Sequence, residues 1–359
     1  MRVIFKIVFV IIGALIGAGF ASGQEIYTFF FVYGKKGVIG IFLMSCLMSL
    51  VLYKVLVIIQ IERINTYKEF IEFIIRKDRK SSKNQNKRYS NNKYFNIENI
   101  TSKIINIFIL ITFYIMIAAF GAYFKQEFNI NSLVGSSVLA TITYFSLIKN
   151  VKGLVKVNGI LVPVLIICII FIGVVSVIQI DILDVIQKLE VIVSKPNIIN
   201  NIYFSSVVYV SYNSILMIPV LITLRKYIKS KSQIKTIATI TGIIICILSI
   251  IIYLILLRID VSTLGSEIEM PVVYIVSKIS KMFKYIYGGI ILGAIYTTTI
   301  SLGVSFLENV VIHGKEKWKI ALLICVTGIC FSLIGFADLI NLLYPIFGYI
   351  GFFQIIRIF

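Results

Sequence analysis

The chain has 359 residues, of which 59% are hydrophobic and 14% are charged, and its mean hydropathy is +0.98. A soluble domain cannot bury so much apolar surface, so the composition indicates an integral membrane protein. The formal net charge of +19 would suit a protein that binds nucleic acid. The basic residues lie between the apolar segments, however, and membrane topology accounts for them better, so no nucleic-acid partner is expected.

The apolar residues come in blocks of membrane-spanning length, since roughly 30 Å of hydrocarbon requires about 17 to 25 residues of helix. The blocks lack the alternation of a transmembrane β-barrel. Ten helical spans are expected, at residues 3–33, 37–61, 104–124, 130–148, 157–179, 202–224, 236–257, 285–307, 319–336 and 338–359. More membrane-length sequence follows the first span, so we expect no cleaved signal peptide and one transmembrane domain over residues 1–359.

The first span is interrupted at its centre by the run Gly17-Ala18-Gly19-Phe20-Ala21-Ser22-Gly23, which Gln24 and Glu25 follow. Glycine disfavours a helix, and hydrocarbon cannot satisfy the backbone groups that a break exposes. Such a break is tolerated where it lines a cavity or a ligand, so residues 17–23 are the leading candidate for a substrate site. The alternative is that these small residues only allow close helix packing.

A polar insertion, residues 62–103, separates the second span from the third. Its segment 76–99 is rich in Lys, Ser and Asn and low in complexity. This composition favours a mobile, solvated cytoplasmic segment rather than a binding motif.

The sixth span also carries polar residues inside an apolar run: Ser205-Ser206, the stretch from Tyr209 to Ser214, and then Pro219. Many transporters contain inverted repeats with interrupted helices at matching positions. Five spans per half, with repeats near 1–179 and 202–359, make the first and sixth spans equivalent. The pattern therefore predicts a second broken helix opposite the first.

Two features precede the last spans. Met270-Pro271 opens a stretch with one apolar face, which predicts an amphipathic outer helix. The eighth span then carries four hydroxyl residues at positions 297, 298, 299 and 301. Together with carbonyls freed by the broken first helix, they would suit a small hard cation, although a threonine in a membrane helix often bonds only its own helix.

The loop charges predict the orientation. Of the 35 Lys and Arg residues, 25 fall on one predicted side of the membrane and nine on the other. Because short cytoplasmic loops collect basic residues, both termini are expected in the cytoplasm.

Several chemistries are not supported by the sequence. The five cysteines lie inside predicted spans without a CxxC pair, and His313 is the only histidine, so neither a zinc site nor a Ser-His-Asp triad can form. There is no GxxxxGK[ST] motif for an ATP-driven pump. We expect no enzyme activity and no cofactor beyond a sodium ion or a proton.

The run Ile16 to Glu25, with Tyr33-Gly34, Gly37 and Gly40 after it, resembles the uncharacterised YkvI-like membrane proteins of bacteria. These are similar to the amino acid, polyamine and organocation transporter superfamily, which has the LeuT-type five-plus-five inverted-repeat fold. The resemblance implies a multi-pass protein of the bacterial cytoplasmic membrane. It also implies alternating access to a small-molecule substrate held between the first and sixth helices.

The resemblance also implies site residues. The free amides of residues 17–22 would bind a substrate carboxylate, and the facing side would be formed by Tyr209, Ser211 and Asn213. Sodium-coupled relatives hold the cation with two carbonyls before the break and an i, i+3, i+4 set on the eighth helix. That spacing fits Gly13, Ile16, Ala294, Thr297 and Thr298.

Glu25 departs from many relatives of this fold and puts sodium coupling in doubt. Intramembrane acids often mark proton paths, so Glu25 is the alternative coupling residue. It could also reach the interface or cap the broken backbone. Two functions fit these observations: a sodium- or proton-driven transporter of an amino acid or similar zwitterion, and a non-transporting receptor or sensor subunit with the same fold.

Overall fold

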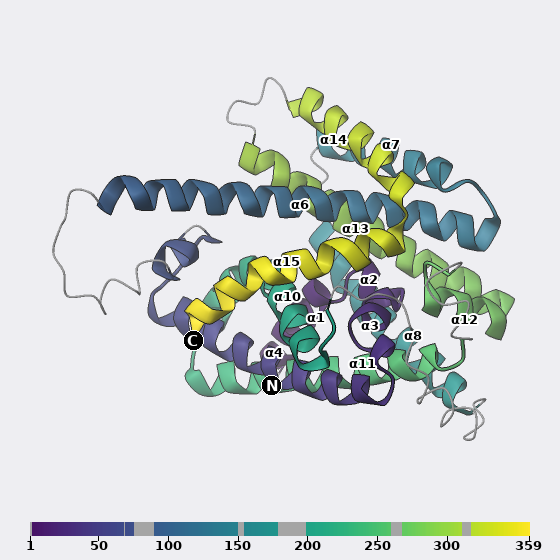
Figure 1. The fold of residues 1–359 in the computed structure, drawn as a ribbon, viewed down its shortest axis with the longest axis horizontal. Helices are drawn as coiled ribbons and strands as arrows, with labels where there is room; N and C mark the ends of the chain where they lie inside the picture. Colours follow the sequence, from purple (N-terminus) through teal and green to yellow (C-terminus); the bar gives the residue numbers. More distant parts are fainter. Residues whose placement is uncertain are drawn as a thin grey trace.

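The computed structural model describes residues 2–67, 69–74, 90–149, 154–178, 199–259, 268–310 and 317–359. The protein is all-α, as predicted (Figure 1). Its helices are α1 (Arg2–Leu15), α2 (Ala18–Ala21), α3 (Gln24–Phe29), η1 (Phe31–Tyr33), α4 (Lys35–Ile61), α6 (Ser90–Phe128), α7 (Ser132–Ile148), α8 (Leu154–Ile178), α10 (Ile202–Leu224), η2 (Arg225–Tyr227), α11 (Lys231–Leu256), α12 (Pro271–Ile279), α13 (Lys281–Val310), α14 (Lys317–Phe331), η4 (Ser332–Ile334) and α15 (Phe336–Ile358).

Each predicted span has a helix or a set of helices in its place. Among the described residues, eight segments are long and apolar enough to cross a bilayer, and α1 and α7 are shorter apolar helices. The first span corresponds to α1, α2, α3 and η1 together, and the other nine correspond to α4, α6, α7, α8, α10, α11, α13, α14 with η4, and α15. The predicted ten-helix membrane fold is confirmed.

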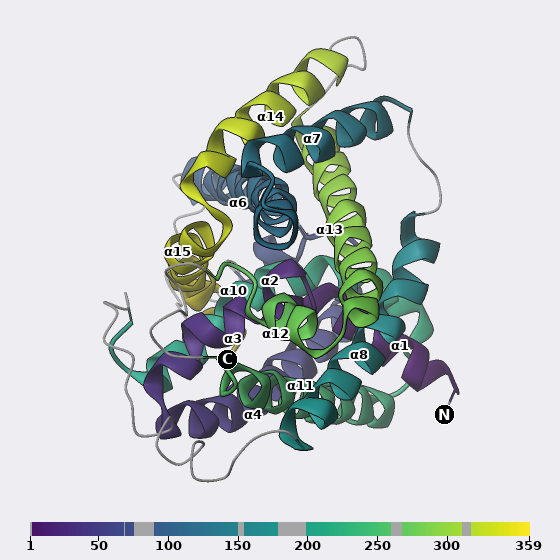
Figure 2. The same cartoon turned by 90° about the vertical axis from the view of Figure 1, so that its right-hand side faces the viewer.

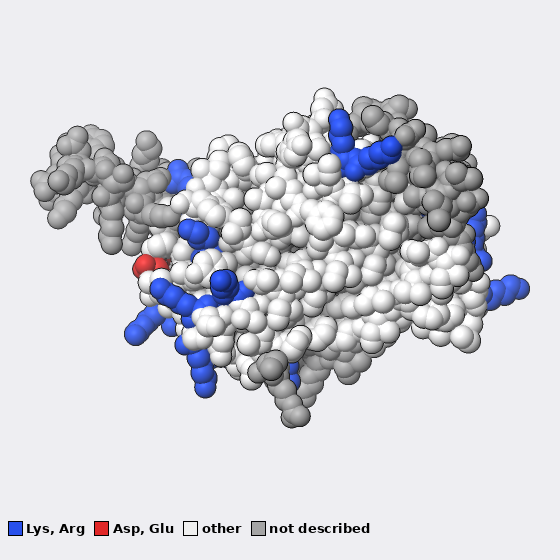
Figure 3. Space-filling model, turned by 90° about the horizontal axis from the view of Figure 1, so that it is seen from below, with Lys and Arg blue, Asp and Glu red and all other residues white. Residues whose placement is uncertain are grey.

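The surface agrees with a lipid environment. The middle of the underside is a broad surface without charged side chains, and Lys and Arg lie around it, towards the left end, at the upper right and at the right edge (Figure 3). Large apolar side chains are exposed on α4 (Ile39, Phe42) and on α11 (Ile243, Ile247). Such side chains are favourable in contact with hydrocarbon and costly in contact with water.

The helix contacts recur in an approximate twofold pattern. Figure 2 shows one of these contacts, in which α4 lies beside α11. Helix α4 packs on α11, and α6 on α13, so the second and third spans contact their own counterparts five spans later. The contact of α1 with α8 recurs as α10 with α15, and that of α1 with α11 recurs as α10 with α4. This is the predicted five-plus-five arrangement. The exact repeat limits, 1–179 and 202–359, stay a prediction.

The first span is broken where the sequence predicts. Helix α1 ends at Leu15, Gly17 is extended with φ −86° and ψ −175°, and α2 contains only four residues. Gly23 then has φ +85°, a left-handed conformation that side chains with a Cβ rarely adopt. Glycine at this position allows the chain to change direction before α3.

The sixth span is not broken, so the prediction of a second broken helix is wrong. Helix α10 is continuous from Ile202 to Leu224, with Pro219 inside it. Its polar side chains bond carbonyls of their own helix: Ser211 Oγ donates to Val207 O at 2.6 Å, and Asn213 Nδ2 to Tyr209 O at 3.0 Å. These bonds satisfy the polar groups without unwinding the backbone.

The remaining elements agree with the sequence except at two boundaries. Helix α6 begins at Ser90, inside the insertion 62–103 that was predicted to be polar and mobile, so the third span continues as a helix well before the predicted start at residue 104. The predicted amphipathic helix is α12, which buries Val272, Val273, Ile275 and Val276. The division of the last two spans lies at Gly335, with φ +96°, rather than around residues 336–338. The low-complexity segment of the insertion falls largely on residues 75–89, outside the described residues.

Candidate substrate and coupling site

The carbonyls that the broken first span frees are bound by side chains and backbone of distant helices. Tyr287 of α13 donates its hydroxyl to Ala21 O at 2.7 Å, and the N–H of Val272 in α12 donates to Ser22 O at 2.9 Å. Ser22 Oγ itself donates to Gly19 O at 3.0 Å. These hydrogen bonds replace the missing helical ones, so the break is stable inside the protein. The bond to Val272 also places the break in contact with α12.

A carboxylate lies at the centre of this region. Glu25, the second residue of α3, is 3% exposed. Its Oε2 accepts hydrogen bonds from the hydroxyls of Tyr209, at 3.2 Å, and Tyr212, both on α10. The backbone N–H of Phe20 in α2 is a further donor to this carboxylate. Glu25 therefore links the broken first span to α10.

The carboxylate of Glu25 occupies the space beside Gly19. A Cβ built on Gly19 would lie 2.9 Å from Glu25 Cγ and 3.1 Å from Cδ, and still nearer Oε1. A Cβ on Gly17 would meet nothing within 4 Å. The glycine at position 19 is thus required for the close approach of Glu25. The chain places its own carboxylate where the family resemblance would place that of a substrate.

The two tyrosines that bind Glu25 belong to a cluster of aromatic rings. The Phe29 ring packs against Tyr209 and Tyr212, with centroids 5.3 and 5.7 Å apart, and Tyr212 packs against Tyr344 of α15 at 4.8 Å. Within the part of the chain that the structure describes, Glu25 makes no ion pair with Lys, Arg or His. A buried carboxylate without a counter-ion is costly unless a proton or a bound cation neutralises it.

Gln24 is a second unusual polar group. Its side chain is fully buried, and neither Nε2 nor Oε1 has a hydrogen-bond partner among the described residues. One turn later, Thr28 donates to Gln24 O at 2.8 Å and to Asn341 Oδ1 of α15 at 2.6 Å. A buried amide left unpaired costs roughly 2–7 kcal/mol, so most such groups in proteins are satisfied by protein, water or ligand.

The structure separates the predicted substrate residues. Residues 17–23 and Tyr209 lie at the Glu25 region. Ser211 bonds Val207 O on its own helix, and its carbonyl lies against Gly351 of α15. Asn213 bonds Tyr209 O and so supports the tyrosine rather than contacting Glu25.

The predicted cation site at Gly13, Ile16, Ala294, Thr297 and Thr298 stays a prediction, and three hydroxyls of the eighth span bond carbonyls of their own helix. Thr297 Oγ1 donates to Gly293 O and Ala294 O, at 3.0 and 3.1 Å. Thr299 and Ser301 likewise bond the carbonyls of Ile295 and Thr297, while Thr298 is half-buried on the same helix. Gly13 faces Val162 of α8, and Ile16 N–H bonds Ile12 O. The hydroxyls thus follow the alternative reading, in which they bond their own helix.

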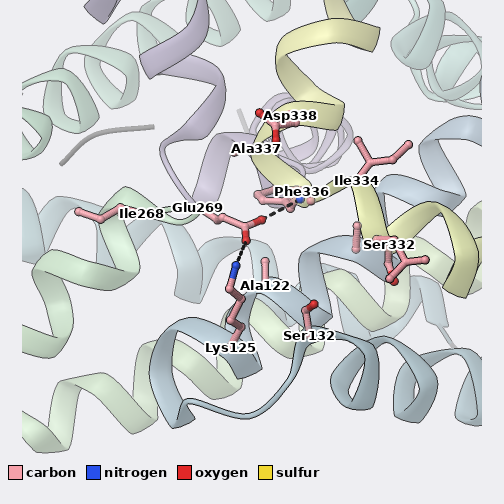
Figure 4. A pocket seen from close by; sticks show the side chains of 13 residues that line it. Ala122, Lys125, Ser132, Ile268, Glu269, Ser332, Ile334, Phe336, Ala337 and Asp338 are labelled. Carbon is pink, nitrogen blue, oxygen red and sulfur yellow. Dashed lines mark hydrogen bonds and ion pairs between the residues drawn. The ribbon is translucent and has the colours of Figure 1, made fainter. Parts of the chain in front are cut away.

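A separate cavity of about 180 Å³ lies beside the chain that enters α12 (Figure 4). There Glu269 accepts from the N–H of Phe336, at 2.8 Å, and from Lys125 Nζ, at 3.4 Å. These bonds join the segment before α12 to the end of α6 and the start of α15. They hold α12 over the broken first span.

Three residues of the Glu25 region were not among the predicted site residues: Gln24, Tyr212 and Tyr344. Tyr212 follows Tyr209 by three positions, a spacing that puts both side chains on one face of a helix. That spacing was visible in the sequence. The position of Tyr344, on the tenth span, was not.

Comparison with known proteins supports the fold. No family model matches the chain. It is 27% identical over 354 residues to the uncharacterised membrane protein YkvI of Bacillus subtilis strain 168, covering 96% of this chain and 92% of that protein. It is 24% identical over 360 residues to the uncharacterised protein YyaD of the same strain, covering 98% and 94%.

Among solved structures, the chain is similar to a manganese transporter of Eremococcus coleocola. Two mutants of that transporter match with TM-scores of 0.53 and 0.54 and 13% identity, over 98% of this chain and 77% of the other. The same transporter bound to an aromatic bis-isothiourea compound matches with a TM-score of 0.51 and 12% identity, over 99% and 78%. At this identity the likeness shows a common fold.

Proposed function

We propose that the protein is an alternating-access secondary transporter of a small organic solute, an amino acid or a related amine, and that Glu25 carries the coupled proton. The observation that carries this proposal is the Glu25 carboxylate, buried at the helix break and bound by two tyrosines of α10. It joins the first repeat to the second at the break in the first span, and such breaks are the usual location of substrate and coupling ions in these folds.

A proton accounts for the contacts better than sodium does. Each of Thr297, Thr299 and Ser301 donates its hydroxyl to a carbonyl of α13, so these side chains need no ion to satisfy them. Glu25 is the acid that lies at the break, and Tyr209 and Tyr212 stabilise its charged form when the proton leaves.

The transport of manganese is a property of the structural neighbour that we do not extend to this chain. Manganese prefers carboxylate and other oxygen or nitrogen ligands gathered around one point. The described residues contain no group of three or more His, Cys, Asp or Glu placed to hold a metal. An organic solute is therefore the better proposal.

Transport can be tested with purified protein in proteoliposomes that contain a fluorescent pH indicator. A panel of amino acids and amines is first screened for stabilisation of the protein in detergent, and the stabilising compounds are then added outside the liposomes. The proposal expects a change in internal pH with the wild-type protein and none with Glu25→Gln. Glu308→Gln, at an exposed position of α13, is the matched control and should behave as the wild type.

A stabilising compound that binds without solute flux or pH change would contradict the transporter proposal. That result would favour the receptor or sensor subunit as the function of this fold.

A further inference from the structure

We infer that the transported solute is an organic ammonium ion that binds the Glu25 carboxylate directly, and that it competes with a proton for this one group. The inference rests on the proposed function and narrows its substrate class. It also makes the protein an exchanger of amines for protons rather than a symporter.

The first step of the argument is the space beside Gly19. A zwitterion anchored by its carboxylate would need the amides of residues 17–22, but the side chain of Glu25 already lies there, with Phe20 N–H as one donor. A substrate carboxylate would meet a like charge at van der Waals distance. A positively charged group would instead be attracted to the same place.

The second step is the aromatic cluster. The rings of Phe29, Tyr209, Tyr212 and Tyr344 pack against one another with centroid separations of 4.8 to 5.7 Å, and the hydroxyls of Tyr209 and Tyr212 bind the Glu25 carboxylate. Aromatic faces attract ammonium groups, and tyrosine rings also contact the hydrocarbon part of an amine. A carboxylate beside such a cluster of aromatic rings offers an organic cation both a charged partner and aromatic faces.

The third step is the unpaired amide of Gln24. It precedes Glu25 directly, is fully buried, and offers one acceptor and two donors without a partner among the described residues. A ligand with an ammonium group and a second polar group would satisfy both Glu25 and Gln24. This buried, unpaired side chain is an observation independent of Glu25 that also indicates a ligand.

Charge balance then gives the exchange step. On one side of the membrane, the amine R–NH3+ binds as Glu25 releases its proton to that side, leaving a neutral carboxylate–ammonium pair. On the other side, a proton binds Glu25, and R–NH3+ leaves. One positive charge moves in each direction, so the cycle is electroneutral for a monoamine. The groups that face Glu25 from α2 and α10 are an amide and two hydroxyls, and α15 adds the hydroxyl of Tyr344, whose ring packs on Tyr212. All of these groups stay uncharged throughout.

The test uses matched pairs of compounds, each an amino acid and the amine that has the same side chain but no carboxylate. The pairs are serine with ethanolamine, valine with isobutylamine, and phenylalanine with phenethylamine. Binding to detergent-purified wild-type protein is measured by thermal stabilisation at several pH values. We expect the amines to stabilise the protein and the amino acids not to. Over the range in which the proton competes, the amine Kd should rise about tenfold for each unit by which the pH is lowered.

Variants localise the effect. Glu25→Gln should lose amine binding. If it fails to fold, Glu25→Asp should keep the fold and weaken binding, because the shorter side chain moves the carboxylate away from the tyrosines. Gln24→Leu should keep the fold and weaken amines that carry a second polar group, such as ethanolamine, more than isobutylamine.

Two outcomes would overturn the inference: stabilisation by the amino acids but not by the amines, or an amine Kd that does not change with pH. In the first case the protein binds its substrate through the substrate carboxylate, and the proposal that it is a transporter still stands. If amines bind with the expected pH dependence but no flux occurs in proteoliposomes, the transporter proposal fails while the amine site stands.

Discussion

Replacing Gly19 by alanine should separate the role of Glu25 from general effects on folding. The new Cβ would lie 2.9 Å from Glu25 Cγ and nearer still to Oε1, whereas ordinary contacts begin at 3.4 Å, so the Glu25 side chain must move by more than about 0.5 Å. The atoms it meets are the end of a flexible side chain rather than backbone, so the helix itself can stay in place. The expected effect is a displaced Glu25 in an otherwise folded protein.

The magnitude follows from the bonds that this displacement breaks. A hydrogen bond to a charged group contributes about 1.5–3 kcal/mol, and Glu25 accepts two from tyrosine hydroxyls. Alanine is better than glycine in a helix by roughly 1 kcal/mol, which offsets part of any loss of stability. We expect the apparent melting temperature to fall by at most a few degrees. Proton-driven transport should fall by about tenfold or more, since 1.4 kcal/mol corresponds to a factor of ten.

The assay compares Gly19→Ala with Gly17→Ala in proteoliposomes containing the pH indicator. Position 17 has room for a Cβ and a φ of −86°, which alanine adopts readily, so this control should transport as the wild type does. Both variants are also compared for melting temperature and expression.

One result would refute the reasoning. If Gly19→Ala transports normally with an unchanged pH profile but melts early, the glycine serves only helix packing. Glu25 would then have no special relation to the break.

Three further predictions follow from the same contacts. Tyr212→Phe removes a donor to the charged form of Glu25, so half-maximal transport should move to higher pH. Tyr344→Phe, which leaves both hydroxyl bonds intact, should not move it, and equal shifts in the two variants would contradict this. Thr298→Ala should leave uptake unchanged in sodium and in potassium buffers, and a loss seen only in sodium would restore the cation site. Gly23→Ala puts a residue with a Cβ at φ +85° and brings that Cβ within 2.8 Å of Val272 Cγ2. The variant should therefore be less stable than the wild type by about 1–2 kcal/mol in denaturation assays. Unchanged stability would show that α12 can move away from position 23 at no cost.

The ten spans and the break in the first were readable from the sequence, because both depend on local properties. A helix in lipid must satisfy its own backbone over the thickness of the bilayer, so its length appears directly as an apolar block. The run from Gly17 to Gly23 interrupts the helix because glycine has a low helix propensity, and in the structure Gly17 is extended while Gly23 has a left-handed φ of +85°. The predicted cytoplasmic position of both termini also rests on the sequence alone and stays a prediction.

The continuity of α10 required the tertiary structure. A serine or asparagine in an apolar run can mark an unwound segment, or it can bond the carbonyl one turn before it. Ser211 and Asn213 do the latter. Nothing in the order of residues distinguishes the two cases, because both use the same donors and differ only in which acceptor is within reach.

The partners of Glu25 were likewise decided by packing. Tyr209 and Tyr212 lie 184 and 187 positions further along the chain, and α3 meets them only because the two halves pack around a common axis. The sequence shows an acid next to the break, but only the tertiary structure shows that the Glu25 side chain lies beside Gly19. Helix contacts at such separations depend on the shapes of many side chains at once, so no local pattern encodes them.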